Sequence, residues 1–252
     1  MRKQRSDGQE TRRNLLGSAC KVFASKGFRQ ATIAEICKKA KVNNAAVSYH
    51  FGSKEDLYVE CWRYAFAQAS KAYPLNGGIP AEAPAEARMR GLIFSIMQRI
   101  TNPKSHAFDI FYKEAANPSG LLTKVMWESV EPIVRGFDLL VSELLDKELN
   151  EQEVQLCSMS IRSQCLGPLL YARRRKSVQD PSQNGLEPLI EDVEQLADHI
   201  TRFSLSGIQC FASKIHNNQK TRLAHELHGS VKKQFDKKGA TTYFRSERSL
   251  LK

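Results

Sequence analysis

The chain has 252 residues, 41% of them hydrophobic, so it can bury one large core or divide into a small and a larger domain. Its mean hydropathy is −0.44, and no apolar run approaches the ~20 residues that cross a bilayer, which argues against a membrane protein. The first residues are charged and lack the apolar stretch of a signal peptide, so we expect a cytoplasmic protein with no membrane partner.

The net charge of +11 is distributed unevenly along the chain. Residues 1–54 carry a net +9, residues 55–213 carry −5, and residues 214–252 carry +7. A basic head on an acidic body indicates that the head alone has a polyanion as its partner. A solvated basic surface would give the same distribution, so charge by itself leaves both interpretations open.

Apolar residues recur with helical spacing along nearly the whole chain, and no segment alternates with period two, so we predict an all-α fold. A first helix is expected over residues 10–26, with Gly27 ending it in the C-cap position. Thr32 begins a second, short helix, and Glu35 three residues later forms a capping box with it. The chain is therefore expected to open with two helices joined by a short turn.

A third and a fourth helix are expected to follow closely. Asn43 is a favourable N-cap for the third, and Gly52 ends it. Ser53 caps the fourth, whose apolar stripe fades near Pro74, before a loop rich in Gly and Pro over residues 75–85. The fourth helix is long enough to connect the basic head rigidly to the body. Its stripe consists of Leu57, Tyr58, Cys61, Trp62, Ala65, Phe66 and Ala69.

The rest of the chain is expected to form a bundle of five more helices. Pro132 predicts a local kink in the third of these, and residues 175–187 form a polar loop. From residue 214 onward the composition is polar and basic, and we expect little ordered structure there. The five predicted helices span residues 85–101, 105–116, 119–148, 151–174 and 188–213.

The three short helices in the first 52 residues, with a four-residue link between the second and the third, have the layout of a helix-turn-helix. A recognition helix enters a DNA major groove about 12 Å wide, so its outer face needs small or polar side chains. The run N-N-A-A-V-S-Y-H at residues 43–50 meets this need, with Val47 facing inward toward Ile33 and Phe23. An ordinary three-helix bundle with a polar surface turn is the alternative.

The stretch TIAEICKKAKVNNAAVSYHFGSKEDLY, residues 32–58, resembles the N-terminal domain of TetR-family regulators. The preceding F-A-S-K-G-F and the spacings between helix ends match as well, so the resemblance covers about residues 9–60. The run NNAAVSYHFGSKEDL and the later segment FYKEAANPSG further resemble the CecR-like branch of that family. The chain departs from the family at Lys41, where a small residue or glycine usually occupies the turn.

The resemblance implies a homodimer whose two heads reach successive major grooves of double-stranded DNA. Asn can bond bidentately to adenine, Ala can touch a thymine methyl group, and Tyr, His and Lys can reach phosphates. The implied base contacts come from Asn43, Asn44, Ala45, Ala46 and Ser48. The implied phosphate contacts come from Thr32, Tyr49, His50 and Lys54.

Charge and composition divide the chain into a DNA-binding head (1–54), a body (55–213) and a basic C-terminal tail (214–252), and the resemblance implies that the body binds a ligand and dimerises. Dimerisation is expected through the last two long helices, although their apolar stripes could instead face the core of one chain. Glu114 could bind a cationic ligand, but we expect it to be exposed. Candidate ligand-binding side chains, each of which could also be plain core, are Phe94, Met97, Phe108, Phe111, Tyr112, Met126, Trp127, Cys157, Ile161 and Cys165.

An enzyme is not expected, because no nucleophile elbow, phosphate loop or zinc-peptidase motif is present. The six cysteines are scattered, and His225 and His228 lack a third ligand nearby, so we expect no cofactor and no metal. The sequence predicts a ligand-responsive transcriptional regulator, most simply a repressor that binds a palindromic operator as a homodimer and is released by a small molecule. The alternative is a helical protein-interaction module with a non-specific basic surface.

Overall fold

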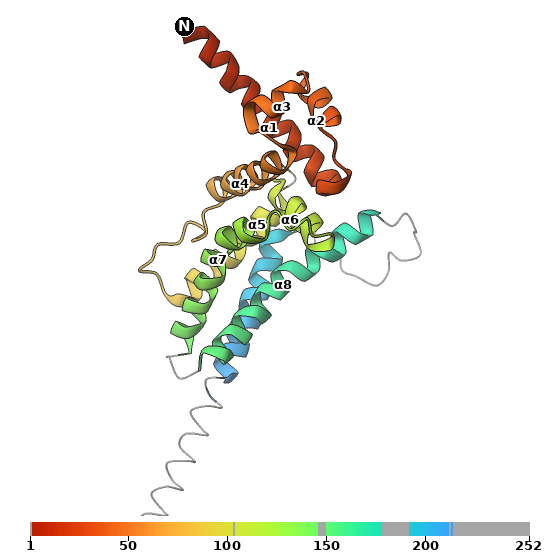
Figure 1. Ribbon diagram of the computed structural model, residues 1–252. Helices are drawn as coiled ribbons and strands as arrows, with labels where there is room; N and C mark the ends of the chain where they lie inside the picture. The colour runs from red at the N-terminus through yellow and green to blue at the C-terminus, as the bar shows by residue number, and fades with distance from the viewer. Residues whose placement is uncertain (1, 103, 146–149, 178–191, 212, 214–252) are drawn as a thin grey trace, which may run out of the picture.

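The computed structural model describes residues 2–102, 104–145, 150–177, 192–211 and 213, and within these ranges the regular structure is entirely helical (Figure 1). The predicted all-α fold is therefore confirmed. None of the described helices is long and apolar enough to cross a membrane. The expectations for the tail from residue 214 and for most of the loop at 175–187 lie outside the described residues.

Three helices form the head: α1 (Arg2–Gln30), α2 (Ile33–Ala40) and α3 (Ala45–Phe51). The connecting helix α4 (Lys54–Ala72) packs against α1 and leads to the body. The first helix begins earlier than the predicted residue 10. The predicted break at Gly27 is present, with φ 75° and ψ 176°, because glycine tolerates this region without a steric cost, and a short helical stretch follows it to Gln30.

The body contains α5 (Ala85–Thr101), α6 (Ala107–Ala116), α7 (Thr123–Leu144), α8 (Glu151–Ser177) and a further helical segment over residues 193–211. In Figure 1 the long helices α5, α7 and α8 and this last segment run beside one another below the head. The predicted start of α7 at residue 119 was too early. A turn with positive φ at Gly120 comes first, and α7 continues through Pro132.

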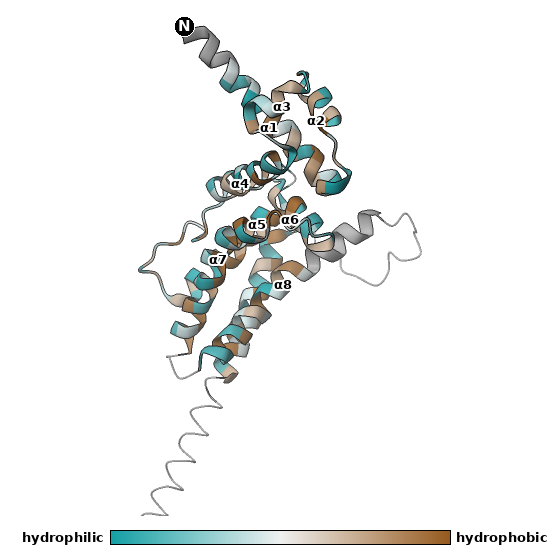
Figure 2. Cartoon of the chain, viewed as in Figure 1, coloured by the Kyte–Doolittle hydropathy of each residue, from teal (hydrophilic) through white to brown (hydrophobic). Residues whose placement is uncertain are grey.

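Two clusters of buried apolar side chains hold the molecule together, and α6 belongs to both. Ala107 and Ile110 pack into the head cluster around Phe23, Tyr58 and Trp62. On the same helix, Phe108 packs into the body cluster, and Phe111 contacts both clusters. Hydrophobic and hydrophilic residues accordingly alternate in patches along each helix (Figure 2).

Candidate nucleic-acid interface and internal cavity

A four-residue link, residues 41–44, sets α3 against α2, as the sequence predicted. Lys41 begins this link in the left-handed region, with φ 56° and ψ 43°, and its N–H donates to the carbonyl of Lys38 at 3.3 Å. The N–H of Val42 donates to the carbonyl of Cys37 at 3.0 Å. These bonds satisfy the last carbonyls of α2, so the turn keeps its geometry although lysine occupies a position that favours glycine.

Thr32 and Ser53 cap α2 and α4 as the sequence predicted, whereas the predicted cap of α3 was wrong by one residue: Asn44, not Asn43, is its N-cap and makes no side-chain capping bond. Thr32 Oγ1 accepts from the Glu35 N–H at 3.2 Å, and Asn43 Oδ1 accepts from the Ala45 N–H at 3.0 Å. The carboxylate of Glu35 accepts from Lys26 at 2.8 Å. Ser53 Oγ accepts from the N–H of residue 56 at 3.0 Å. The helix-turn-helix is thus fixed by local hydrogen bonds.

The recognition-helix candidate α3 has an apolar inner face and a polar outer face. Val47 and Phe51 are buried in the head core, while Tyr49 is 84% exposed. Figure 1 shows α3 at the end of the molecule away from the body. The predicted DNA-contact residues that are exposed are Thr32, Asn43, Asn44, Ala45, Ser48 and Tyr49. The three that are half-buried are Ala46, His50 and Lys54.

Two cationic side chains lie over aromatic rings, near the end of α3 and the start of α4. The ammonium of Lys54 lies 4.4 Å from the ring centre of Phe28, and the guanidinium of Arg12 lies 4.7 Å from that of Phe51. Arg12 is exposed and also pairs with Glu60 at 3.4 Å. Arg12 is not among the contact residues predicted from the sequence, although the basic pair at positions 12 and 13 is a signal that could indicate it.

The head is joined to the body through a buried hydrogen-bond network. Glu114, which we expected to be exposed, is only 7% exposed, because α6 packs this side chain against α4. Its Oε2 accepts from the Tyr58 hydroxyl at 3.0 Å, and its Oε1 accepts from the N–H and the hydroxyl of Ser119 at 2.9 and 2.8 Å. Burial first, and then the Glu114 carboxylate, raise the pKa of Tyr58, which therefore stays a neutral donor.

A second bond joins α4 to α7: the indole of Trp62 donates to Ser129 Oγ at 3.0 Å, and the Ser129 hydroxyl donates to the carbonyl of Val125 at 2.7 Å. Together with the Tyr58–Glu114 bond, this contact ties the connecting helix to both α6 and α7. Movement of α6 or α7 therefore changes contacts that position α4.

A cavity of about 820 Å³ lies among α4, α5, α6, α7 and α8. This volume falls within the range of roughly 300–1,000 Å³ that is usual for small-molecule sites. Five of the ten predicted ligand-binding residues line it: Phe108, Phe111, Met126, Trp127 and Cys165. Lining residues that were not predicted from the sequence include Trp62 and Phe66 on α4, Arg99 on α5 and Arg162 on α8.

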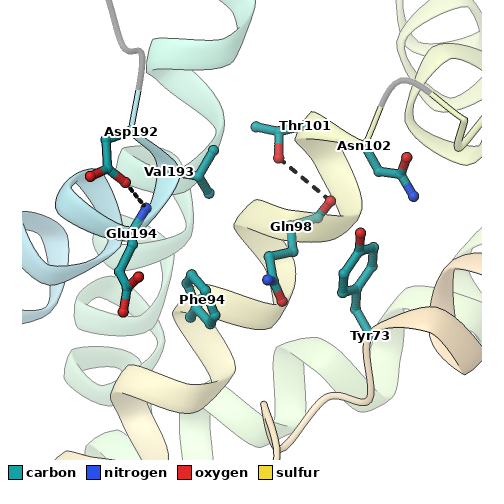
Figure 3. A pocket seen from close by; sticks show the side chains of 8 residues that line it. All are labelled: Tyr73, Phe94, Gln98, Thr101, Asn102, Asp192, Val193 and Glu194. Atoms are coloured by element: carbon teal, nitrogen blue, oxygen red, sulfur yellow. Dashed lines mark hydrogen bonds between the residues drawn. The ribbon is translucent and has the colours of Figure 1, made fainter.

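The other five predicted ligand-binding residues lie elsewhere. Met97 and Ile161 are buried in the body core, Cys157 is half-buried against it, and Tyr112 is 41% exposed. Phe94 lines a separate cleft of about 500 Å³ between α5 and the start of the 193–211 segment (Figure 3). The remaining residues of this cleft are Tyr73, Gln98, Thr101, Asn102, Asp192, Val193 and Glu194.

The last two described helices have both buried and exposed apolar side chains. Ile161 and Cys165 on α8 and Ile200 on the 193–211 segment contribute to the body core. Other large hydrophobic side chains on these helices are exposed, with Phe203 the most exposed among them at 63%. The exposed set on these two helices is Leu156, Met159, Phe203 and Phe211. An exposed apolar patch rimmed by polar residues is typical of a protein interface.

The capped three-helix head, its exposed polar α3 and the helical body define a helix-turn-helix regulator. The sequence pattern of the bacterial regulatory proteins of the tetR family matches residues 15–61. That of the C-terminal domain of the HTH-type transcriptional dual regulator CecR matches residues 85–208. The chain belongs to the TetR family of transcriptional regulators, as its sequence suggested, and its body is similar to that of CecR.

Characterised relatives share parts of the chain. The transcriptional regulator SrpR of Pseudomonas putida is 26% identical over 122 residues, which are 48% of this chain and 54% of SrpR. CecR of Shigella flexneri is 43% identical over 54 residues, 21% of this chain and 24% of CecR. The chain thus matches about half of the one relative and a quarter of the other.

Solved structures share the fold over most of the chain. The fatty acid degradation regulator FadR of Bacillus halodurans superposes with a TM-score of 0.58 at 16% identity, covering 78% of this chain and 95% of FadR. AibR, solved with isovaleryl coenzyme A and operator DNA, superposes with a TM-score of 0.57 at 17% identity, covering 76% of this chain and 96% of AibR. At these identities the likeness establishes the fold alone.

Proposed function

We propose that the protein is a ligand-responsive transcriptional repressor that binds a palindromic operator as a homodimer and leaves it when a small molecule binds the body. The observation that carries this proposal is the division of α3 into a buried face, held by Val47 and Phe51, and an exposed face of small and polar side chains. Only such a helix can enter a major groove while remaining anchored to its domain.

The side chains of α3 and of the link before it suit different contacts with DNA. Asn43 and Asn44 can each bond to an adenine edge, while Ala45 and Ala46 can contact thymine methyl groups and Ser48 a base edge. The phosphate contacts proposed are Thr32, Tyr49, His50 and Lys54. We add Arg12, because its exposed guanidinium lies over Phe51 at the end of α3.

The functional parts follow the charge distribution: a DNA-binding head over residues 1–54, a ligand-binding and dimerisation body over 55–213, and a basic tail from 214. The exposed set on α8 and the 193–211 segment supports dimerisation through these helices. A two-fold axis there would bury this apolar surface in a four-helix interface and set two heads at a fixed spacing. We place the protein with its DNA, in the cytoplasm.

Ligand control is supported by the 820 Å³ cavity, since α4 contributes Trp62, Phe66 and Ala69 to its wall. AibR, with the same fold, was solved with both an acyl coenzyme A and operator DNA, which favours a body that binds small molecules here too. A ligand that prefers a different position of α4 would change the spacing of the heads, and operator affinity would fall by the same coupling free energy.

The test is fluorescence anisotropy of the purified protein on DNA from upstream of its own gene, with random DNA as competitor, at two salt concentrations. We expect the upstream DNA to bind at least about a thousandfold more tightly than random DNA. The double variant Asn44→Ala/Tyr49→Ala should lose this preference, while Arg135→Ala, an exposed site on α7 that pairs with Glu131 one helical turn away, should keep it. Equal binding of both DNAs would refute operator recognition in that region. Absence of any binding would favour the interaction-module alternative.

A further inference from the structure

The cavity is lined mostly by aromatic and aliphatic residues, together with three charged residues. Two are arginines, Arg99 on α5 and Arg162 on α8, and one is Glu114 on α6. The charged lining therefore has a net charge of +1. Which of these groups is already satisfied within the protein determines the ligand chemistry that the cavity favours.

Glu114 has little capacity left for a ligand. Its two oxygens accept three hydrogen bonds, from the Tyr58 hydroxyl and from the N–H and hydroxyl of Ser119. A carboxylate that accepts several hydrogen bonds is stabilised as an anion without a cationic partner. A cationic ligand would have to compete with this network and to enter a cavity that already holds two guanidinium groups.

Arg99 is in the opposite situation. It is only 8% exposed, and its burial lowers its pKa. Its Nε donates to the carbonyl of Tyr73 at 2.7 Å and its Nη1 donates to Ser70 Oγ at 3.2 Å, so both acceptors are neutral. No carboxylate in the described part of the chain forms an ion pair with Arg99. Because a guanidinium has five N–H donors, three are left for other acceptors.

Arg162 adds to this excess of donors. Its Nε donates to the carbonyl of Ser158 at 3.2 Å, and this residue too has no ion pair with a carboxylate among the described residues. A buried charge without a counter-ion is costly, and a guanidinium is well suited to bidentate contact with a carboxylate or phosphate. The cavity thus lacks an anion and offers a large apolar volume beside the place where one would bind.

We infer that the effector is an amphipathic organic anion, with an apolar body in the aromatic cavity and a carboxylate or phosphate group held by Arg99, and with Arg162 adding positive potential. This inference rests on the proposed ligand control. Binding of such an anion can also affect the position of the head through α4. Arg99 and Ser95 both donate to the carbonyl of Tyr73, which follows the last turn of α4. An anion that draws Arg99 away loosens the end of α4.

The binding test needs no DNA, because both tryptophans of the chain, Trp62 and Trp127, line the cavity and report on its occupancy. Tryptophan fluorescence would be titrated with dodecanoate, dodecyl phosphate, dodecanol and dodecyltrimethylammonium, each below its micelle-forming concentration. We expect at least one of the two anions to bind about tenfold or more tightly than the alcohol and the cation, as one charge-assisted contact would produce. The comparison of dodecanoate with dodecyl phosphate then distinguishes the two anionic groups.

The variants assign the preference to residues. Arg99→Met should reduce affinity for the preferred anion to that for dodecanol, Arg99→Lys should retain part of it, and Arg135→Met on the exposed side of α7 should leave it unchanged. If circular dichroism shows that Arg99→Met does not fold, Arg162→Met is the second variant to test. It should also lower the affinity for the preferred anion, by a smaller factor.

The inference is overturned if the alcohol binds as well as the anions, if none of the four probes binds, or if dodecyltrimethylammonium binds best and Glu114→Gln abolishes that binding. It is also overturned if every folded arginine variant of the cavity retains the full anion preference. Because fluorescence is read on the free protein, these outcomes are separate from a failure to recognise operator DNA. Release of upstream DNA by the preferred anion, measured afterwards by anisotropy, would connect the two proposals.

Discussion

Removing the hydroxyl of Tyr58 tests whether the bond between α4 and α6 contributes to the stability of the molecule. In the variant Tyr58→Phe the ring keeps its place between Phe23 and Phe28, whose centres lie 4.7 and 5.2 Å away, so packing is preserved. What is lost is a fully buried hydroxyl that donates to the Glu114 carboxylate at 3.0 Å. A hydrogen bond to a charged group contributes about 1.5–3 kcal/mol.

The assay is urea unfolding at fixed protein concentration, followed by circular dichroism. We expect the free energy of unfolding to fall by about 1.5–3 kcal/mol. In thermal unfolding the same loss would lower the melting temperature by roughly 3–12 °C for a chain of this size. Tyr112→Phe is the matched control, because this tyrosine lies on the same helix as Glu114 but is 41% exposed. A double-mutant cycle with Glu114→Gln should give a coupling energy above about 0.5 kcal/mol. If Tyr58→Phe is as stable as the Tyr112→Phe control, the reasoning is refuted.

Three further predictions follow from other parts of the structure. Lys41→Gly relieves a left-handed backbone and should stabilise the head by up to about 1 kcal/mol in urea unfolding; no gain would mean that the turn is not strained. The variant Leu156→Glu/Phe203→Glu charges the exposed set on the last two helices and should sediment as a monomer with unchanged circular dichroism, whereas a wild-type monomer would contradict dimerisation. Burial raises the pKa of the Cys165 thiol from 9.0 to about 12, so the neutral thiol is favoured in the folded state. Its contribution to stability is complete below pH 9 and is lost as pH rises toward 12, so Cys165→Ala should weaken the fall in stability over that interval, and an unchanged slope would exclude the effect.

The features that depend on neighbours in sequence were predictable. The caps at Thr32 and Ser53 and the positive φ at Gly52 follow from residue types whose preferred backbone geometry is local. The bounds of α5 were predicted to the residue, since Pro84 and Asn102 flank a strongly periodic apolar segment.

The features that depend on packing between distant helices were not predictable in the same way. Periodicity shows that Phe94 and Met97 on α5 and Phe108 on α6 each lie on the apolar face of their helix. Which of them lines the cavity depends on the angles at which the helices cross, and only Phe108 does. Likewise, the burial of Glu114 depends on the hydroxyls of Tyr58 and Ser119, one of which lies 56 residues away. A carboxylate on an amphipathic helix gives no local sign of such partners.

The position of α6 in both cores has a consequence for how such regulators can be recombined. Ala107 and Ile110 come from the body in sequence, yet they complete the packing around Phe23 in the head and Tyr58 on α4. A head excised after α4 would expose that surface to water, so we expect it to fold poorly by itself. A functional chimera made by exchanging heads between two relatives must therefore also carry a matching face of α6. The boundary of the unit that can be exchanged thus does not coincide with the end of the DNA-binding motif.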